Sequence, residues 1–312
     1  ASIIIGTRSA IYTPLPRLGL IILDEEHDLS YKQQEGFRYH TRDVALYRGH
    51  LQGCPVILGS ATPSIDSYHL VESGKLHLLE LNQRAGVAVL PKMHVIDLKI
   101  AKKKHGISQS LLEQIKHTLE RKEQVLIFLN RRGYAPILMC ESCGWQANCP
   151  HCDAHFTLHS QPYHYLHCHH CGTINRLPEH CPACQKQSLK TIGAGTAKLE
   201  EHLQELFPHN EVIRVDRDST SRVGSWQKIY DRIQQNKPSI LLGTQMLAKG
   251  HHFPHVTLVA ILDIDAGLLS VDPRAPERTA QLIVQVAGRA GRGEHKGSVY
   301  LESLRPDQPM LT

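Results

Sequence analysis

The chain has 312 residues, enough for about two domains, and its 41% of hydrophobic residues can fill their cores. It has no apolar run long enough to span a bilayer, and its first residues lack the basic start and cleavage site of a secretion signal. These features exclude secreted and membrane-spanning classes and predict a soluble intracellular protein. A formal net charge of +5 permits a polyanionic partner without identifying one.

The chain opens on three isoleucines, residues 3–5, which predict a strand followed by the turn Gly6-Thr7-Arg8-Ser9. The hydroxyls and the guanidinium of that turn suit a phosphate backbone. Because the chain does not begin with Met and starts within an expected strand, we predict that it is part of a longer protein.

The second apolar run, from Leu18 to Leu23, ends abruptly in Asp24-Glu25-Glu26-His27 and predicts a buried parallel strand. Three carboxylates at the end of such a strand repel one another and lose hydration, so a bound cation or a reacting phosphate explains them economically. The pattern is typical of the second motif of nucleoside triphosphatases, in which one carboxylate holds Mg²⁺ and the next positions the attacking water. The alternative is an acidic turn that caps a helix.

A polar loop is predicted at residues 29–40, with three of the scarce aromatic residues beside two cations. The residues are Tyr31, Lys32, Phe37, Arg38 and Tyr39. Aromatic rings interleaved with cations suit stacking on unpaired bases, whereas the alternative is that the rings only fold back into the domain.

Strands alternate with helices along the rest of the chain, which predicts an α/β fold with a mostly parallel sheet. Ser108 is expected to cap the helix 109–121, and the basic run 99–106 is expected to be a linker. The other predicted helices are 44–51, 198–207, 225–235 and 280–286. The predicted strands are 55–58, 76–81, 93–98, 125–129, 212–215, 240–242, 258–262 and 299–301.

Eight of the nine cysteines form four Cys-x-x-Cys pairs within one short segment, and only Cys54 stands apart. The pairs are Cys140/Cys143, Cys149/Cys152, Cys168/Cys171 and Cys181/Cys184. This spacing predicts two tetrahedral zinc sites in preference to disulfides or redox dithiols. Four pairs can combine into two sites in three ways, and the spacing cannot choose among them.

No Gly-x-x-x-x-Gly-Lys-Ser/Thr phosphate loop occurs in the sequence, since Gly74-Lys75 lacks both the upstream glycine and the following hydroxyl. Four other stretches resemble, in order, motifs II, III, V and VI of superfamily 2 helicases. They are Asp24–His27, Gly59-Ser60-Ala61-Thr62, Gly243-Thr244 through Gly250, and Gln285-Val286-Ala287-Gly288-Arg289-Ala290-Gly291-Arg292. With the inserted cysteine pairs and Lys249-Gly250-His251-His252-Phe253-Pro254, the chain resembles the primosomal protein N′ (PriA) family of replication-restart helicases over essentially its whole length.

This resemblance implies two RecA-like α/β lobes, the first of them incomplete, with an inserted two-zinc module in the second. The implied limits are 1–100 for the first lobe, 101–136 and 189–312 for the second, and 137–188 for the module. The resemblance favours nested pairing of the cysteines. It implies that Cys140, Cys143, Cys181 and Cys184 hold one zinc, and that Cys149, Cys152, Cys168 and Cys171 hold the other.

The resemblance also implies residue roles at an ATP site between the lobes. Asp24 would hold Mg²⁺, Glu25 would orient the water, and Gly250, Gln285, Arg289 and Arg292 would act on the nucleotide from the second lobe. His27, Ser60 and Thr62 would couple the motifs. The implied DNA contacts are Arg8, Tyr31, Lys32, Phe37, Arg38, Tyr39, Thr196 and Thr244.

The implied function is an ATP-dependent 3′ to 5′ DNA helicase of replication restart that remodels stalled forks and promotes reloading of the replicative helicase. The implied partners are single-stranded and forked DNA, PriB, DnaT, single-stranded-DNA-binding protein and the replicative helicase, in the bacterial cytoplasm near the nucleoid. Without the first phosphate-binding motif, we expect this chain alone not to hydrolyse ATP. The alternative function is a zinc-dependent scaffold that binds DNA or partners through inactive helicase lobes.

Overall fold

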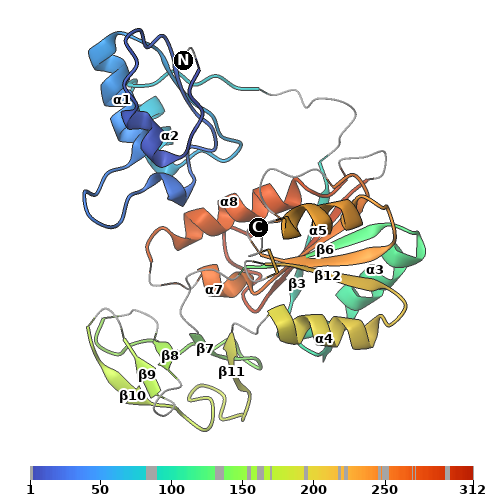
Figure 1. The fold of residues 1–312 in the computed structure, drawn as a ribbon. Helices are drawn as coiled ribbons and strands as arrows, with labels where there is room; N and C mark the ends of the chain where they lie inside the picture. Colours follow the sequence, from blue (N-terminus) through green and yellow to red (C-terminus); the bar gives the residue numbers. More distant parts are fainter. Residues whose placement is uncertain are drawn as a thin grey trace. The chain divides into compact units, whose positions relative to one another are not determined.

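The computed structural model describes the chain apart from residues 1–2, 82–89, 131–136, 153–155, 160–164, 169–170, 193–195, 217–218, 221–223, 245–246, 248–252, 269, 271, 292–295 and 312. It divides into two compact units, Ala1–Asn82 and Gln83–Thr312. Figure 1 shows the elements of both units as a ribbon.

The first unit is built on two short parallel strands, β1 (Ile21–Leu23) and β2 (Val56–Leu58), paired in register. Two helices accompany them, α1 (Thr41–Gln52) and α2 (Ile65–Glu72), together with the 3-10 turns η1 (Arg8–Tyr12) and η2 (Leu29–Tyr31). The core is small and consists of Ile11, Ile21, Leu23 and Ala45. Because successive strand residues face opposite sides, Ile22 and Ile57 point away from this core and stay exposed.

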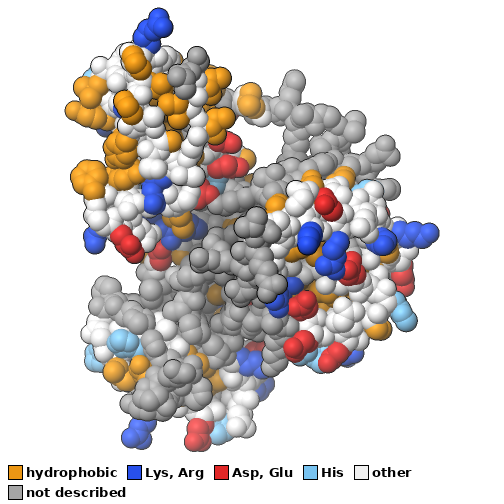
Figure 2. Space-filling model, in the orientation of Figure 1, with side chains coloured by type: hydrophobic (Ala, Val, Ile, Leu, Met, Phe, Trp, Pro, Cys, Tyr) orange, Lys and Arg blue, Asp and Glu red, His pale blue; other side chains and the backbone are white. Residues whose placement is uncertain are grey.

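Apolar side chains are unusually common on the surface of the first unit, as the hydrophobic atoms over it in Figure 2 show. Ile5 is 94% exposed, Leu79 85% and Ile22 62%. A sheet of two strands has too little area to bury both of its faces together with two helices.

The second unit contains a six-stranded sheet in the order β12-β13-β6-β14-β15-β3, and every pairing within it is parallel. The predicted mostly parallel sheet is therefore confirmed. The strands are β3 (Lys92–Asp97), β6 (Gln124–Leu129), β12 (Glu211–Val215), β13 (Ser239–Gly243), β14 (Val256–Leu262) and β15 (Ser298–Ser303).

Helices cover both faces of this sheet, which gives a three-layer α/β/α lobe (Figure 1). Leu126 and Phe128 of β6 pack into one apolar cluster, with residues of α5, α7 and α8, while Val125 and Ile127 pack into the other, with residues of α3 and α4. This alternation explains the continuous apolar strands that the sequence shows. The helices are α3 (Gln109–Glu120), α4 (Thr196–Leu206), α5 (Ser225–Ile233), α7 (Ile264–Leu268) and α8 (Ala275–Ala287).

Helix α3 forms where its pattern predicts. Leu111, Ile115 and Leu119 recur on one face and are buried, and the Ser108 hydroxyl accepts a hydrogen bond from the Leu111 amide at 3.3 Å. Among the helices that the structure describes, none has the length and apolar character needed to cross a membrane.

The cysteine-rich insertion forms an antiparallel sheet in the order β10-β9-β8-β7-β11. The strands are β7 (Ile137–Cys140), β8 (Thr157–His159), β9 (Tyr165–His167), β10 (Ile174–Arg176) and β11 (Leu189–Ile192). Its first and last strands pair with each other, with Ile137 opposite Ile192. The insertion thus leaves the lobe and returns to it through one two-stranded stem.

Several elements of the structure differ from the sequence-based expectations. Residues 3–5 and 76–81 form no strand, because no neighbouring strand among the described residues pairs with them. The basic run 99–106 is not a plain linker, since Lys103–Lys104 (β4) pairs with Ile107–Ser108 (β5). Strand β3, which lies within the residues 1–100 expected for the first lobe, pairs with β15, and the two compact units divide after Asn82.

Gly267 in α7 is a position where only glycine fits. A Cβ atom there would lie 2.6 Å from the Asn130 side-chain nitrogen and would also collide with the Thr279 hydroxyl. We predict that Gly267→Ala lowers the free energy of unfolding of the second unit by about 1–3 kcal/mol, as overpacking does. Denaturant unfolding measures this, with Gly19→Ala as the control because an added Cβ there meets nothing within 4 Å. Equal stability of the two variants would contradict the prediction.

Candidate functional site

The acidic turn follows β1 and is held against the end of β2 by backbone hydrogen bonds. The Gly59 amide donates to the Leu23 carbonyl at 2.8 Å, and the Glu26 amide donates to the Gly59 carbonyl at 3.0 Å. Glu25 has a φ of 50°, in the left-handed region, which costs about 1 kcal/mol or more for a residue with a Cβ. The turn leaves the Asp24 and Glu25 side chains exposed, so both carboxylates are accessible to a ligand.

His27 joins the acidic turn to the segment after β2. Its Nδ1 lies 2.7 Å from the Ser60 hydroxyl and 3.6 Å from a carboxylate oxygen of Glu25. The Ser60 hydroxyl in turn accepts a hydrogen bond from the Thr62 amide at 3.0 Å. The structure therefore brings together the three residues that the resemblance groups as coupling residues.

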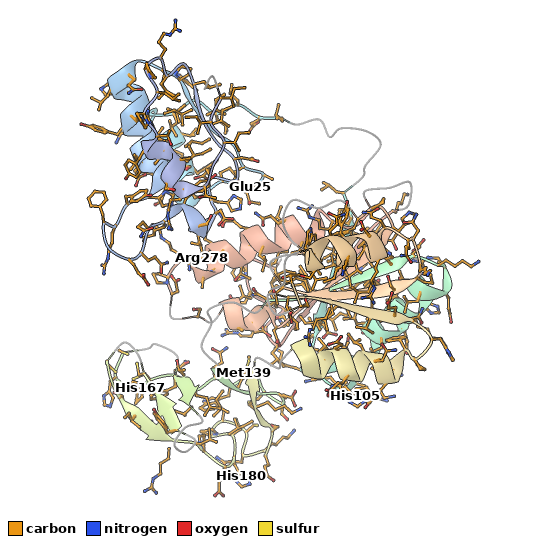
Figure 3. The ribbon with its side chains drawn as sticks, viewed as in Figure 1. Glu25, His105, Met139, His167, His180 and Arg278 are labelled. Atoms are coloured by element: carbon orange, nitrogen blue, oxygen red, sulfur yellow. The ribbon has the colours of Figure 1, made fainter. Side chains whose placement is uncertain are left out.

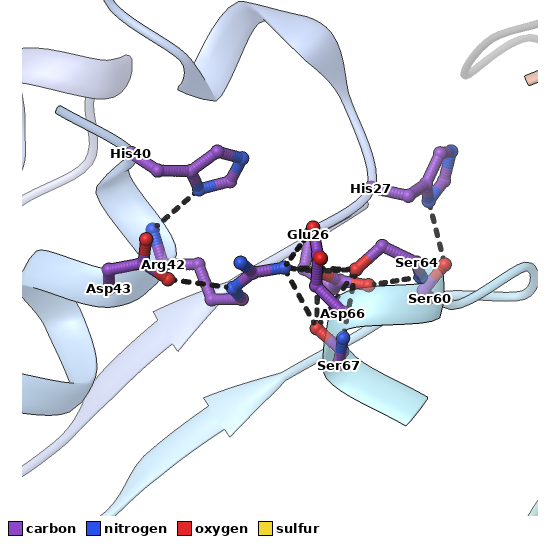
Figure 4. A network of polar contacts seen from close by, with 9 residues as sticks. All are labelled: Glu26, His27, His40, Arg42, Asp43, Ser60, Ser64, Asp66 and Ser67. Atoms are coloured by element: carbon purple, nitrogen blue, oxygen red, sulfur yellow. Dashed lines mark hydrogen bonds and ion pairs between the residues drawn. The ribbon is translucent and has the colours of Figure 1, made fainter. Parts of the chain in front are cut away.

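Glu26 is buried, unlike its two acidic neighbours, and is 1% exposed. Its carboxylate accepts hydrogen bonds from the Ser64 amide at 2.7 Å, the Ser64 hydroxyl at 3.1 Å and the Ser67 hydroxyl at 2.8 Å. The Arg42 guanidinium, also buried, lies 3.9 Å from it and donates to the Ser64 hydroxyl at 3.1 Å. Figure 4 shows how this network links the acidic turn to the first turns of α1 and α2.

Two exposed acidic side chains, Asp43 and Asp66, also lie beside the guanidinium of Arg42. Its Nε donates to Asp43 at 3.0 Å, and a carboxylate oxygen of Asp66 lies 3.6 Å from Nη1. At the start of α1, the His40 ring accepts a hydrogen bond from the Arg42 amide. Burial and the neighbouring Arg42 lower the pKa of His40, which keeps the ring neutral and able to accept that bond.

The aromatic loop is tied to the acidic turn through Tyr31. Its hydroxyl donates to the Asp24 carbonyl at 2.8 Å. Burial, followed by the charges of Asp24, Asp28 and Glu25, raises the pKa of Tyr31, so this hydroxyl stays protonated and remains a donor at neutral pH.

The other predicted residues of this loop differ in their surroundings. Arg8 Nη1 donates to the carbonyls of Ser30 and Lys32 at 3.1 and 3.0 Å, so part of its guanidinium fixes the loop. The Tyr39 ring packs edge-on against Tyr12, with centroids 5.1 Å apart. The remaining predicted contacts, Lys32, Phe37 and Arg38, are exposed, and Phe37 is 79% exposed.

Among the described residues of the second unit, the predicted site residues lie at or near the ends of strands and helices. Thr244 directly follows β13 and is 8% exposed. Gln285 lies on α8, and Arg289, 8% exposed, follows its last turn. Thr196 begins α4, although its side chain is outside the described part of the structure, as are Gly250 and Arg292.

The eight paired cysteines gather into two groups of four, with the sulfur atoms of each group within 4.8 Å of one another. The groups are Cys140, Cys143, Cys181 and Cys184, and Cys149, Cys152, Cys168 and Cys171. These are the nested groups that the resemblance implies. The Sγ–Sγ distances of 3.4–3.6 Å are far longer than a disulfide and close to the edge of a tetrahedron of about 3.8 Å around a thiolate-bound metal ion.

One thiol in each group is easily deprotonated. Burial raises the pKa of Cys140, but hydrogen bonds from the Ser188 hydroxyl and nearby amides bring it down to about 6. Hydrogen bonds from the Thr173 hydroxyl and amide lower the pKa of Cys171 to about 6. Metal ligation requires thiolates, so both groups are chemically suited to hold a metal ion.

The sequence did not reveal the buried network around Glu26. Its members are separated along the chain, since Glu26 lies in the acidic turn, Arg42 lies on α1, and Ser64 and Ser67 lie at the start of α2. One usable signal is Ser64, which is followed three residues later by Ser67, because serine is a residue typical of a helix cap.

Residues 190–294 match the family model of the helicase conserved C-terminal domain. The replication restart protein PriA of Haemophilus influenzae is 53% identical over the whole chain, which spans 43% of that protein. The PriA protein of Bacillus subtilis is 42% identical over 97% of the chain and 38% of its own length. The chain therefore spans less than half the length of these curated relatives.

Among solved structures, the E. coli DExH-box NTPase HrpB is similar over 93% of the chain and 28% of its own, with a TM-score of 0.47 and 13% identity. S. cerevisiae Dbp5 bound to RNA and ADP BeF3 is similar over 95% of the chain and 55% of its own, with a TM-score of 0.47 and 13% identity. The identities to the curated relatives are far higher and extend over the cysteine-rich insertion. The chain thus belongs to the family of the replication restart proteins PriA.

Proposed function

We propose that this chain contributes the motor part of an ATP-dependent DNA helicase that moves 3′ to 5′ along DNA during replication restart. The observation that supports this most is the connection of the acidic turn to two other motifs. His27 joins Glu25 to Ser60, and the Tyr31 hydroxyl joins the aromatic loop to Asp24. A change in the conformation of the aromatic loop would therefore alter the positions of the Asp24 and Glu25 carboxylates.

Magnesium and ATP are the proposed ligands of the first motif. Asp24 and Glu25 are exposed carboxylates at the end of a parallel strand, where α/β proteins bind ligands, and oxygen donors are what Mg²⁺ prefers. The bound ion would neutralise charge on the phosphates. Asp24 would hold the ion, Glu25 would orient the water, and Gly250, Gln285, Arg289 and Arg292 would contribute to nucleotide binding.

Zinc is the proposed occupant of each cysteine group. Four thiolates in a closed tetrahedron leave no open position, so such sites stabilise structure and do not activate water. Each ion would cross-link segments that are far apart in sequence, and the module would then present a fixed surface to unwound DNA and to partner proteins.

Single-stranded and forked DNA are the proposed substrates, with the exposed Phe37, Arg38 and Lys32 as contacts of the loop and Arg8, Tyr31, Tyr39, Thr196 and Thr244 as further contacts. Fork remodelling, reloading of the replicative helicase and contacts with PriB, DnaT and single-stranded-DNA-binding protein belong to the same proposal. They are supported by similarity to replication restart proteins.

The decisive test is Glu25→Gln in a protein that spans the full length of the PriA relatives. We expect DNA-stimulated ATP hydrolysis to fall by at least about 100-fold, because the amide cannot accept a proton from the attacking water, while DNA binding is retained. Glu72→Gln, at the exposed end of α2, is the matched control and should keep its activity. Normal replication restart by the Glu25→Gln variant would instead favour a zinc-dependent scaffold with inactive helicase lobes.

A further inference from the structure

A groove of about 570 Å³ lies where the cysteine-rich insertion meets the sheet of the second unit. The side of the insertion contributes Trp145, Gln146 and Asn148, and the side of the sheet contributes Lys99, Arg305 and Asp307. Its volume is within the range of sites for small ligands, a class to which a single nucleotide belongs.

The floor of this groove is fixed by packing and by a buried acid. Met139 of β7, labelled in Figure 3, is fully buried and packs with Leu304 at the end of β15. Asp265, 3% exposed, accepts hydrogen bonds from the Leu304 amide at 2.8 Å and from the Ser303 hydroxyl. These contacts hold the segment that carries Arg305 against the first knuckle of the insertion.

The two cations of the groove, Lys99 and Arg305, differ in their contacts from two nearby lysines. Lys103 and Lys190 both pair with Glu141, at 3.4 and 2.8 Å. Within the described part of the chain, the side chains of Lys99 and Arg305 form no hydrogen bond or ion pair. Asp307 is the only carboxylate among the described groove residues, which also include Cys143 of the first cysteine group. The positive charges of the groove therefore come from Lys99 and Arg305, and these two side chains can contact an anionic ligand.

The groove also offers an aromatic ring and an amide. The partly buried Trp145 packs on the apolar core of the insertion and lines the groove. Gln146 is 7% exposed, and its amide nitrogen has no hydrogen-bond acceptor among the residues described. A buried donor of this kind is rare, and the last torsion of a glutamine side chain is soft enough to turn it toward a ligand.

We propose that this groove binds a nucleotide of a single-stranded nucleic acid, with phosphate held by Lys99 and Arg305 and the base stacked on Trp145. Unpaired strands are bound in this way, by cations that follow the backbone and aromatic rings that take the bases. Gln146 and Asn148 are placed to contact a base or a sugar. The site stands on the groove alone and does not depend on the proposed ATP-driven activity.

Tryptophan fluorescence of the complete chain, with its metal sites loaded, tests the stacking directly. The chain has two tryptophans, and Trp226 packs on the core of the sheet, away from the groove residues. We expect an oligothymidylate of about eight nucleotides to quench the fluorescence of Trp226→Phe, which keeps Trp145, and to leave that of Trp145→Phe unchanged. Quenching of Trp145→Phe alone would overturn the proposal.

Salt dependence tests the phosphate contacts. Removing one phosphate contact reduces the slope of log affinity against log salt by about 0.7 for a single strand, so we expect about 1.4 for the double variant Lys99→Gln, Arg305→Gln. The matched control is Lys116→Gln, an exposed lysine on α3, and should keep the original slope. An unchanged slope in the double variant would reject the site.

Two further measurements separate a nucleotide from other anions. Trp145→Ala should lower affinity for the oligonucleotide about tenfold, and Asp307→Asn should raise it, since the acid repels phosphate. Circular dichroism and metal content show whether each variant remains folded. A poly-glutamate peptide that binds as tightly as the oligonucleotide and does not require Trp145 would show that the groove is a site for acidic peptides instead.

Discussion

Replacing Cys168 by serine is expected to reduce the zinc content of the chain from two ions to one. Cys168 is fully buried, belongs to the inner group with Cys149, Cys152 and Cys171, and lies in the apolar core of the insertion. A hydroxyl is a poor zinc ligand, and structural zinc sites with fewer than four good ligands bind weakly. The outer group keeps its four thiolates and should keep its ion. Its members are Cys140, Cys143, Cys181 and Cys184.

The loss of the inner ion should also unfold most of the insertion. Structural zinc supplies roughly 10–16 kcal/mol of binding free energy in small zinc domains, more than the small apolar core of this insertion can replace. Limited proteolysis should therefore cut the variant between the outer cysteines while the six-stranded sheet remains protected. Cys54→Ser is the matched control, because Cys54 is half-buried in the first unit and outside both groups. Loss of both ions from Cys168→Ser would show that the two sites are not independent.

Replacing Glu26 by alanine is expected to destabilise the first unit by about 3–5 kcal/mol. The change removes the acceptor of the Ser64 amide and of two hydroxyls, and it leaves the buried guanidinium of Arg42 without this carboxylate. Each buried donor left without its acceptor costs about 1–3 kcal/mol, and the Arg42 charge keeps only the exposed Asp43 and Asp66 beside it. A first unit with such a small core has little stability to lose.

Hydrogen exchange of the amides in β1 and α2 measures this effect within the first unit. Glu26→Gln should lie between wild type and Glu26→Ala, since the amide oxygen can still accept from Ser64 but the charge is lost. Glu25→Gln is the control for stability, because the Glu25 side chain is exposed and the neighbouring His27 keeps its contact with the Ser60 hydroxyl. Equal protection in the Glu26 and Glu25 variants would mean that the network does not hold the turn.

The sheet of the second unit could be predicted because its strands are buried on both faces and therefore read as continuous apolar runs. Strand β6 is an example, with residues 125–129 facing two different clusters. The isoleucines at 3–5 show the limit of that signal. An apolar run indicates a strand only where a neighbour is available to pair with it, and sequence periodicity contains no information about neighbours.

The residues of the candidate site also differ in whether the sequence could predict them, because some contacts are local in sequence and others are long-range. The acidic turn and the four cysteine pairs are local in sequence, so their residues could be named in advance. The burial of Glu26 could not, because its partners Arg42, Ser64 and Ser67 come from two helices and look like ordinary surface residues. The cysteine pairing was open for a related reason: the β7–β11 pairing that brings the outer knuckles together is a long-range contact, with Cys140 opposite Leu189.

The stem formed by β7 and β11 has a consequence for how this chain can vary. Ile137 and Ile192 are register partners, so they lie side by side in the stem. The residues between them therefore connect two adjacent positions, as the loop of a hairpin does, whatever the length of the segment. Loop-closure entropy grows only slowly with length, so domains tolerate large excursions at such points. The insertion is in this sense modular. A short turn could replace it without rerouting the parallel sheet, and helicase lobes could gain or lose such a metal-binding branch in evolution while their core topology stays the same.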